Sequence, residues 1–188
     1  MRQAAPGQDP SIVEKIVAGA RRQIGAGYDP AYRALPYPNG DVPRDRGVCT
    51  DVVIRALRTA GFDLQRLIHE DMRRNFGRYP RRWGLRRPDP SIDHRRVPNQ
   101  MTFFRRHALV LTVRLTDEKQ CFLLCEWEAG DIVYWKLPNG RDHCGVLAFN
   151  ENCYGMPYVV HNLSRCVEED CLDRWKIIGH FRYPKPKR

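Results

Sequence analysis

The residue with the clearest chemical potential is a cysteine at the start of a predicted helix. Cys49 lies in the stretch Gly47–Val53, and apolar residues continue at helical spacing through Leu57 and Ala60. Free backbone N–H groups and the positive end of the helix dipole stabilise a thiolate at such a position. The pattern therefore predicts a reactive thiol, and the backbone N–H of Cys49 is placed to donate to an oxyanion.

Two histidines on predicted strands supply the groups that a catalytic thiol needs. His143 opens one apolar strand and His161 ends the next. In antiparallel neighbours the start of one strand lies beside the end of the other, so we expect the two rings to be adjacent. Nucleophilic catalysis requires a base and an orienting group, and we assign these roles to His143 and His161, with Asn162 as the alternative orienting group.

Each of these residues also has an ordinary structural interpretation. A cysteine at a helix start is often buried and inert, and His143 alone would more often be structural. Asp51 suits the positive end of the predicted helix as a simple charge. The conjunction of a thiol on a helix with polar residues on two later strands favours catalysis. The His and Cys spacing fits no common zinc pattern, so neither a metal nor another cofactor is predicted.

The composition indicates one globular domain over residues 1–188. The chain is 42% hydrophobic and 10% aromatic, and it contains no apolar run long enough to span a membrane. Its first residues show no apolar signal-peptide segment. The net charge of +10 favours a polyanion or an anionic surface, or else a generally basic surface. Nucleic-acid motifs are absent from the sequence, so nucleic acid is not expected as a partner.

The seven cysteines allow two interpretations. Cys49 stands apart, and the other six lie near one another in sequence as 121 with 125, 144 with 153, and 166 with 171. One reactive thiol and up to three disulfides would imply an oxidising compartment. The alternative is a set of buried, reduced cysteines that act as small hydrophobic residues.

Periodicity predicts helices first and strands second. A capping box at Ser11–Glu14 begins a helix that ends near Gly25, Asp63 caps a third helix, and residues 99–107 form a short one. Residues 73–99 are an Arg- and Pro-rich surface excursion that shapes a cleft, and 184–188 form a loose basic tail. The predicted strands are 109–113, 121–127, 131–135, 144–149, 158–161 and 175–183. This order predicts an α+β fold with N-terminal helices packed on a C-terminal antiparallel sheet.

The motifs resemble the NlpC-type cell-wall cysteine peptidases, a papain-like group, and more closely the domain-of-unknown-function family 1287. The matching stretches are 47–55, 63–65, 69–72, 92–99, 130–133, 137–138, 143 with 145–146, 160–162 and 179–183. The group's Asp-Cys-Ser-Gly pattern is absent, because Val48 precedes the cysteine and Thr50 follows it. Cys144 stands after His143 where an aliphatic residue would be expected.

This resemblance implies a peptidoglycan hydrolase that is periplasmic or secreted and cleaves an amide bond in the stem peptide. It implies Cys49, His143 and His161 as catalytic residues. The residues expected to contact the substrate are Tyr37, Asp51, Arg95 and Asn162. Three alternatives stay open at this point: a toxin effector with an immunity or inhibitor protein as partner, a cysteine acyltransferase or thioesterase, and an inactive domain that binds cell wall or nucleic acid.

Overall fold

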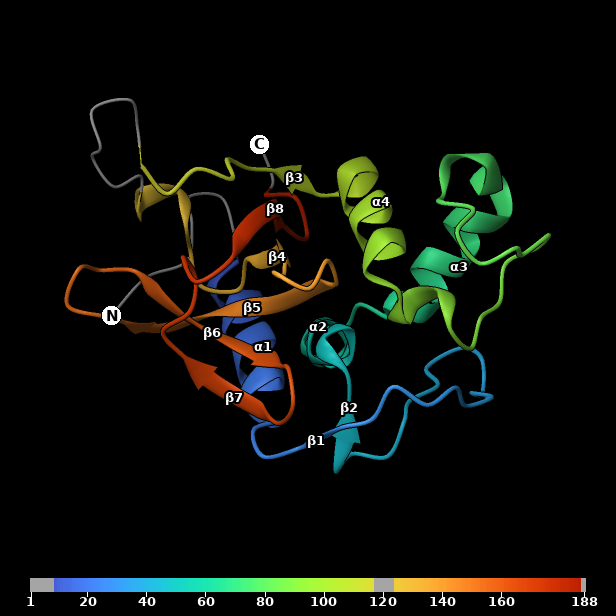
Figure 1. The fold of residues 1–188 in the computed structure, drawn as a ribbon, viewed down its shortest axis with the longest axis horizontal. Helices are drawn as coiled ribbons and strands as arrows, with labels where there is room; N and C mark the ends of the chain where they lie inside the picture. The colour runs from blue at the N-terminus through green and yellow to red at the C-terminus, as the bar shows by residue number, and fades with distance from the viewer. Residues whose placement is uncertain (1–8, 117–123, 187–188) are drawn as a thin grey trace.

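The computed structural model describes residues 9–116 and 124–186, and it has the predicted α+β architecture. A six-stranded antiparallel sheet has the order β3-β8-β4-β5-β6-β7, and helices cover one of its faces (Figure 1). The helices are α1 (Pro10–Arg21), α2 (Cys49–Thr59), α3 (Leu64–Asn75) and α4 (Val97–His107). The sheet strands are β3 (Leu109–Val110), β4 (Ile132–Lys136), β5 (Asp142–Glu151), β6 (Pro157–Asn162), β7 (Cys166–Glu169) and β8 (Lys176–Arg182). A separate parallel pair is formed by β1 (Gly27–Tyr28) and β2 (Arg46–Gly47).

The helix boundaries follow the capping chemistry, with one correction. Asp63 caps α3 as predicted, because its carboxylate accepts the Gln65 N–H at 3.2 Å. Helix α1 instead begins at Pro10, and Asp9 accepts the Ser11 N–H at 2.9 Å. Proline is well suited to the first helical turn, since it has no N–H to leave unpaired. The Ser11–Glu14 capping box therefore does not mark the start of this helix.

The strand predictions need two corrections at the edges of the sheet. Leu124–Glu126 form a 3-10 turn where a strand over 121–127 was predicted, and residues 121–123 lie outside the described part of the chain. The sequence also missed β7, whose four residues are too short and too acidic to give a strand signal. The central strands β4, β5, β6 and β8 form where alternation and β-branched residues predicted them.

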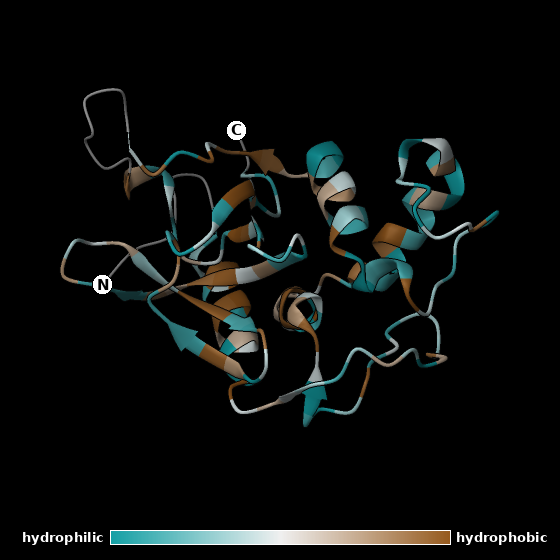
Figure 2. Ribbon diagram, in the orientation of Figure 1, coloured by the Kyte–Doolittle hydropathy of each residue, from teal (hydrophilic) through white to brown (hydrophobic). Residues whose placement is uncertain are grey.

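The sheet has two buried faces with different partners. On β5, Cys144, Val146 and Ala148 pack in the same core cluster as α1 and α2. Leu147 belongs to a second cluster on the other face, around Trp127 and Trp135. In Figure 2 the hydrophobic colour gathers on α1, α2 and the strands that they contact. Because successive side chains of a strand alternate between the two faces of the sheet, the helices contact only every second side chain of β5.

This alternation explains why the predicted disulfides do not form. The six cysteines in the described residues are all free thiols. Cys166 packs on the helix face and Cys171 packs in the cluster on the opposite face. Cys144 is buried on β5, whereas Cys153 is exposed after that strand. The remaining expected partner, Cys121, lies outside the described residues. Across the described ranges, none of the helices has the length and apolarity needed to cross a bilayer.

A buried charge cluster joins β4 to β8. Asp131 is fully buried, and the Arg182 guanidinium donates to both of its carboxylate oxygens at 2.7 Å. The His180 ring lies 2.9 Å from the same carboxylate through Nε2 and stacks on Trp127 with ring centroids 3.8 Å apart. A carboxylate in this place needs both partners, because burial without them would leave an uncompensated charge.

We expect Asp131→Asn to lower the free energy of unfolding by about 3–5 kcal/mol, because it leaves Arg182 buried without its counter-charge. Urea unfolding followed by circular dichroism measures the loss. The matched control is Asp45→Asn, which removes the exposed partner of Arg46 and should change stability far less, because solvent screens an exposed pair. Equal losses in the two variants would contradict the role assigned to the cluster.

Candidate active site

Cys49 is the first residue of α2 and lies in a cleft of about 350 Å³. The residue before it, Val48, offers no side-chain oxygen to the helix start, and the Asp51 carboxylate instead accepts the Val48 N–H at 2.7 Å. The N–H groups of the first helical turn have no carbonyl partner within the helix. The sulfur of Cys49, which is 6% exposed, therefore lies beside free backbone donors at the cleft wall.

A buried ion pair between two of the residues expected to contact the substrate supports this helix start. Arg95 donates from Nε and Nη2 to the two oxygens of Asp51, each at 2.9 Å, and both side chains are almost fully buried. Arg95 also donates to the carbonyl of Ala31 at 3.3 Å. The guanidinium and the carboxylate bind each other and hold the helix start in place, and Arg95 also lines the cleft.

The two histidines meet as the antiparallel arrangement predicted. His161 pairs with Gly145 across β5 and β6, which makes His143 its diagonal neighbour on the same face. His143 Nε2 lies 2.9 Å from His161 Nδ1, and both rings are buried. Trp135 stacks on His143 with ring centroids 5.6 Å apart, and Trp175 lies edge-on to both imidazoles. The rings therefore have a fixed, largely dry position.

A glutamate that the sequence analysis missed completes this hydrogen-bonded row. His161 Nε2 lies 2.9 Å from Glu169 Oε1, and Arg174 donates to both oxygens of that carboxylate at 2.8 and 3.1 Å. The bond from Arg174, followed by the bond from His161, lowers the pKa of Glu169. Burial, helped by the charge of His143, lowers the pKa of His161 to about 4. At neutral pH His161 is therefore neutral and can accept at one nitrogen and donate from the other.

The Cys49 thiol has two polar neighbours on β5. A hydrogen bond from the Cys144 side chain is the largest influence, and a hydrogen bond and the charge of His143 add to it. Against the opposing effect of burial, these lower the pKa of Cys49 to about 5. The pKa of Cys144 is raised well above its ordinary value by burial and by the neighbouring Cys49. Cys49 is thus the thiol that ionises, and Cys144 keeps its proton and donates it.

Asn162 takes a structural position and not that of a third catalytic group. It is buried on the helix side of β6, and its Nδ2 donates to the carbonyls of Ala26, Gly27 and Gly47 at 3.3–3.4 Å. These carbonyls belong to the segments around β1 and β2 that precede the nucleophile. Asn162 was expected to contact the substrate or to orient His143. Its hydrogen bonds instead hold the chain that precedes Cys49 in place.

The tyrosine that borders the cleft is not the one that the sequence spacing predicted. Tyr37 packs edge-on against His69, with ring centroids 5.0 Å apart, and is not part of the cleft lining. Tyr28 lines the cleft, and burial followed by the charge of Cys49 raises its pKa. The parallel pairing of Tyr28 with Gly47 brings it beside the nucleophile. Spacing within a loop cannot reveal such a pairing.

Part of the predicted Arg- and Pro-rich excursion lines the cleft, but its ends belong to α3 and α4, and residues 93–95 are buried. Trp83 lines the cleft and is covered by the guanidinium of Arg96, 4.0 Å from the ring centroid. Arg96 is itself paired with Asp93 at 3.0 Å. On the opposite wall Arg141 has an exposed side chain, with no ion pair to any other residue in the ranges described. Arg141 is therefore the cleft cation that is available to an anionic group.

One cluster has the residue types of a metal site. The ligand atoms of His161, Glu169 and Cys171 lie within 4.8 Å of one another. The Arg174 guanidinium already occupies both oxygens of Glu169, and burial raises the pKa of Cys171 to about 12. A cation would have to displace Arg174 and a thiol proton, so we derive no chemical step from a metal here.

We expect the alkylation rate of Cys49 by iodoacetamide to rise with a midpoint near pH 5, because a lowered pKa keeps the thiolate down to that pH. Cys144→Ala removes the largest stabilising bond, so its midpoint should move toward the ordinary thiol value. Peptide mass mapping distinguishes Cys49 from the other thiols. Cys166→Ala, another buried cysteine on the helix face, is the control and should leave the midpoint in place. A midpoint above pH 8 in the wild-type protein would contradict the lowered pKa of Cys49.

The fold and the site together define an α+β protein with a buried thiol–imidazole centre. The chain belongs to the family described as "Domain of unknown function (DUF1287)", which residues 17–183 match. One relative, the Escherichia coli K12 "Uncharacterized protein YijF", is 48% identical over 189 residues, which cover 95% of this chain and 89% of that protein.

Solved structures share the fold at low sequence identity. Two structures of an N-acetylmuramoyl-L-alanine amidase from Bacteroides uniformis superimpose with TM-scores of 0.53 and 0.51, at 12% and 13% identity. The first match covers 92% of this chain and 98% of the amidase, and the second covers 91% and 97%. The whole described arrangement of helices and sheet is thus similar to that of an amidase.

Proposed function

We propose that this protein is a thiol-dependent hydrolase that cleaves an amide bond in the stem peptides of peptidoglycan. The observation that carries the proposal is Cys49, at a helix N-terminus in an open cleft, with its pKa lowered to about 5 beside His143. The proposal places the whole chain, residues 1–188, with the NlpC-type papain-like enzymes as one catalytic domain. The fold shared with the Bacteroides uniformis amidase supports it.

The first step is attack by the Cys49 thiolate on the scissile carbonyl carbon. The carbonyl oxygen becomes an oxyanion, for which the unpaired backbone N–H of Cys49 at the helix start is a donor. Tyr28 lines the same cleft and keeps its proton, because its pKa is raised, so its hydroxyl is a second donor. His143 then gives its proton to the leaving amine, and the acyl group stays on the sulfur as a thioester.

The second step is hydrolysis of that thioester. A water molecule loses a proton to the now neutral His143 and attacks the carbonyl carbon. The tetrahedral intermediate collapses, the carboxylic product leaves, and the sulfur of Cys49 is released as a thiolate. The protonated His143 and the thiolate restore the starting ion pair.

The hydrogen-bonded row behind His143 sets its tautomer. His143 Nε2 is bound to His161, so the other ring nitrogen, Nδ1, is the one that serves Cys49. His161 accepts at Nδ1 when its Nε2 donates to Glu169. The carboxylate thus fixes the ring orientation of one imidazole and, through it, favours the protonated form of the other.

The cleft suits a peptide substrate that carries carboxylates. Arg141 presents a guanidinium with no carboxylate partner among the described residues, and planar guanidinium groups bind carboxylates through two parallel hydrogen bonds. Asp142, beside it, is already paired with Lys136 and with Arg82 at 3.9 Å. We therefore assign recognition of a stem-peptide carboxylate to Arg141 in place of Arg95.

Such a substrate places the protein outside the cytoplasm, in the periplasm or in the secreted fraction. A toxin effector that acts on the wall of a rival cell would use the same chemistry, with an immunity or inhibitor protein as its partner. Both settings require the same catalytic cleft and the same nucleophile.

We expect Glu169→Gln to lower kcat by about 10- to 100-fold, because loss of a group that orients an imidazole from behind has effects of this size. Glutamine retains the size and an acceptor oxygen but removes the charge that favours protonated His143. Glu168→Gln is the matched control, because this neighbouring glutamate pairs with Arg21 on the other face of β7. An equal loss of kcat in both variants would contradict the role assigned to the hydrogen-bonded row behind His143.

Digestion of purified sacculi tests the proposed function itself. Wild type and a Cys153→Ala control, which alters an exposed thiol, should release fragments with new amine termini, and Cys49→Ala should release none. Mass analysis of the fragments identifies the bond. Release that persists in Cys49→Ala would contradict the assigned nucleophile. No release by wild type, with Cys49 still reactive to a thiol label, would instead indicate another acyl substrate.

A further inference from the structure

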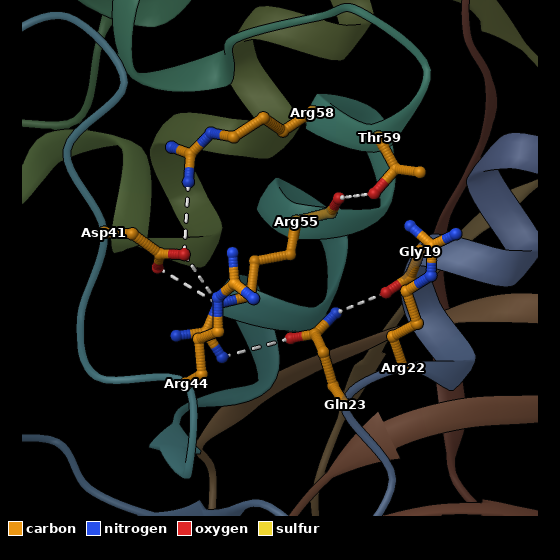
Figure 3. Close-up of a pocket in the computed structure, with 8 residues that line it drawn as sticks. All are labelled: Gly19, Arg22, Gln23, Asp41, Arg44, Arg55, Arg58 and Thr59. Atoms are coloured by element: carbon orange, nitrogen blue, oxygen red, sulfur yellow. Dashed lines mark hydrogen bonds and ion pairs between the residues drawn. The ribbon is translucent and has the colours of Figure 1, made fainter.

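A second cavity lies between the end of α1, the outer side of α2 and the segment that precedes β2. Its volume is about 270 Å³, and it shares no lining residue with the cleft of Cys49. Figure 3 shows side chains from all three segments pointing toward a common space. The lining consists of Gly19, Arg22, Gln23, Asp41, Arg44, Arg55, Arg58 and Thr59.

Arg55 is held rigidly at the base of this cavity. Its Nε lies 3.0 Å from both carboxylate oxygens of Asp41, and its Nη2 donates to the carbonyls of Val42 and Pro43 at 2.9 and 3.1 Å. Gln23 accepts from Nη1 at 3.4 Å (Figure 3). The residue is 8% exposed, so its position is already ordered before any ligand arrives.

Arg58 is only partly satisfied. Its Nη2 donates to the carbonyl of Gly40 at 3.0 Å, and its Nη1 lies 3.3 Å from Asp41. The remaining donor, Nε, is buried and has no hydrogen-bond partner. An unpaired buried donor is destabilising, and an acceptor bound in the cavity would relieve that cost.

The cavity carries a large excess of positive charge. Four arginines line it, Asp41 is shared by Arg55 and Arg58, and a second carboxylate, Asp63, lies 3.6 Å from Arg58 Nη2. Arg22 and Arg44 are exposed at the rim, and within residues 9–116 and 124–186 neither makes an ion pair. Two fixed guanidinium groups and two free ones thus surround one space.

We propose that this cavity binds a phosphate group. A phosphate carries more charge than a carboxylate, and its oxygens point in several directions, which suits donors that come from three segments of the chain. Its charge matches the excess of the four arginines over the two carboxylates that pair with them, Asp41 and Asp63. The group can belong to a lipid headgroup or to a soluble phosphate ester, since both present the same oxygens to the four arginines.

The site would act apart from the catalytic chemistry. Arg55 and Cys49 lie on the same helix, but the cavity opens between α1 and the segment before β2, away from the residues that line the cleft. A phosphate bound there would anchor the protein to an anionic surface or polymer while leaving the cleft open. This inference does not depend on the proposed hydrolysis.

The test is titration of the intact protein with inorganic phosphate, followed by calorimetry. We expect saturable one-site binding that weakens about tenfold or more in the double variant Arg22→Gln with Arg44→Gln, since each lost guanidinium removes charge-assisted bonds. The matched control is Arg86→Gln with Arg105→Gln, which removes the same charge from exposed positions outside the cavity. This control should bind phosphate within about twofold of wild type. Urea midpoints confirm that both double variants stay folded.

Vesicles separate the two sources of phosphate. Sedimentation with phosphatidylglycerol vesicles that free phosphate reverses, and that the cavity double variant loses, would identify a lipid headgroup. Saturable phosphate binding without sedimentation would identify a soluble phosphate ester. Absence of saturable binding by wild type, or equal weakening in the two double variants, would overturn the proposal and leave only a general basic surface.

Discussion

The contact between the first turn of α2 and the start of β5 is the constraint on which the site depends. It brings the sulfur of Cys49 against a buried thiol, Cys144, and an imidazole, His143, while burial removes competing water. Burial alone would raise the pKa of Cys49, so the stabilising bonds must exceed that cost for the thiolate to persist. The start of β5 supplies both partners, Cys144 from the face that packs on the helices and His143 from beside Trp135.

Much of the surrounding polarity serves to hold that contact in place. The pair of Asp51 and Arg95 fixes the helix start from one side, and Asn162 fastens the preceding chain from the other. Glu169 and His161 hold the ring of His143 from behind. These groups are almost fully satisfied by one another, so the polar atoms left for a substrate are few and lie on the cleft walls.

The sequence predicted the parts of this arrangement that depend on local patterning. An apolar stripe after Cys49 was sufficient for α2, and the order of two strands was sufficient to place His143 beside His161. It could not reveal contacts set by tertiary packing: the ion pair that binds Arg95 to Asp51, or the strand pairing that brings Tyr28 to the cleft. The expected disulfides failed for a similar reason, because spacing along the chain does not show which face of a sheet a cysteine occupies.

The most direct test of the account is to trap the acyl-enzyme. The protein would be mixed with a stem peptide, quenched in acid within milliseconds to seconds, and examined by intact and peptide mass spectrometry. A thiolate nucleophile predicts an acyl adduct confined to the peptide that contains Cys49, which builds up before product and is absent from Cys49→Ala. Hydrolysis of the peptide with no adduct at any time, and undiminished in Cys49→Ala, would contradict the central claim.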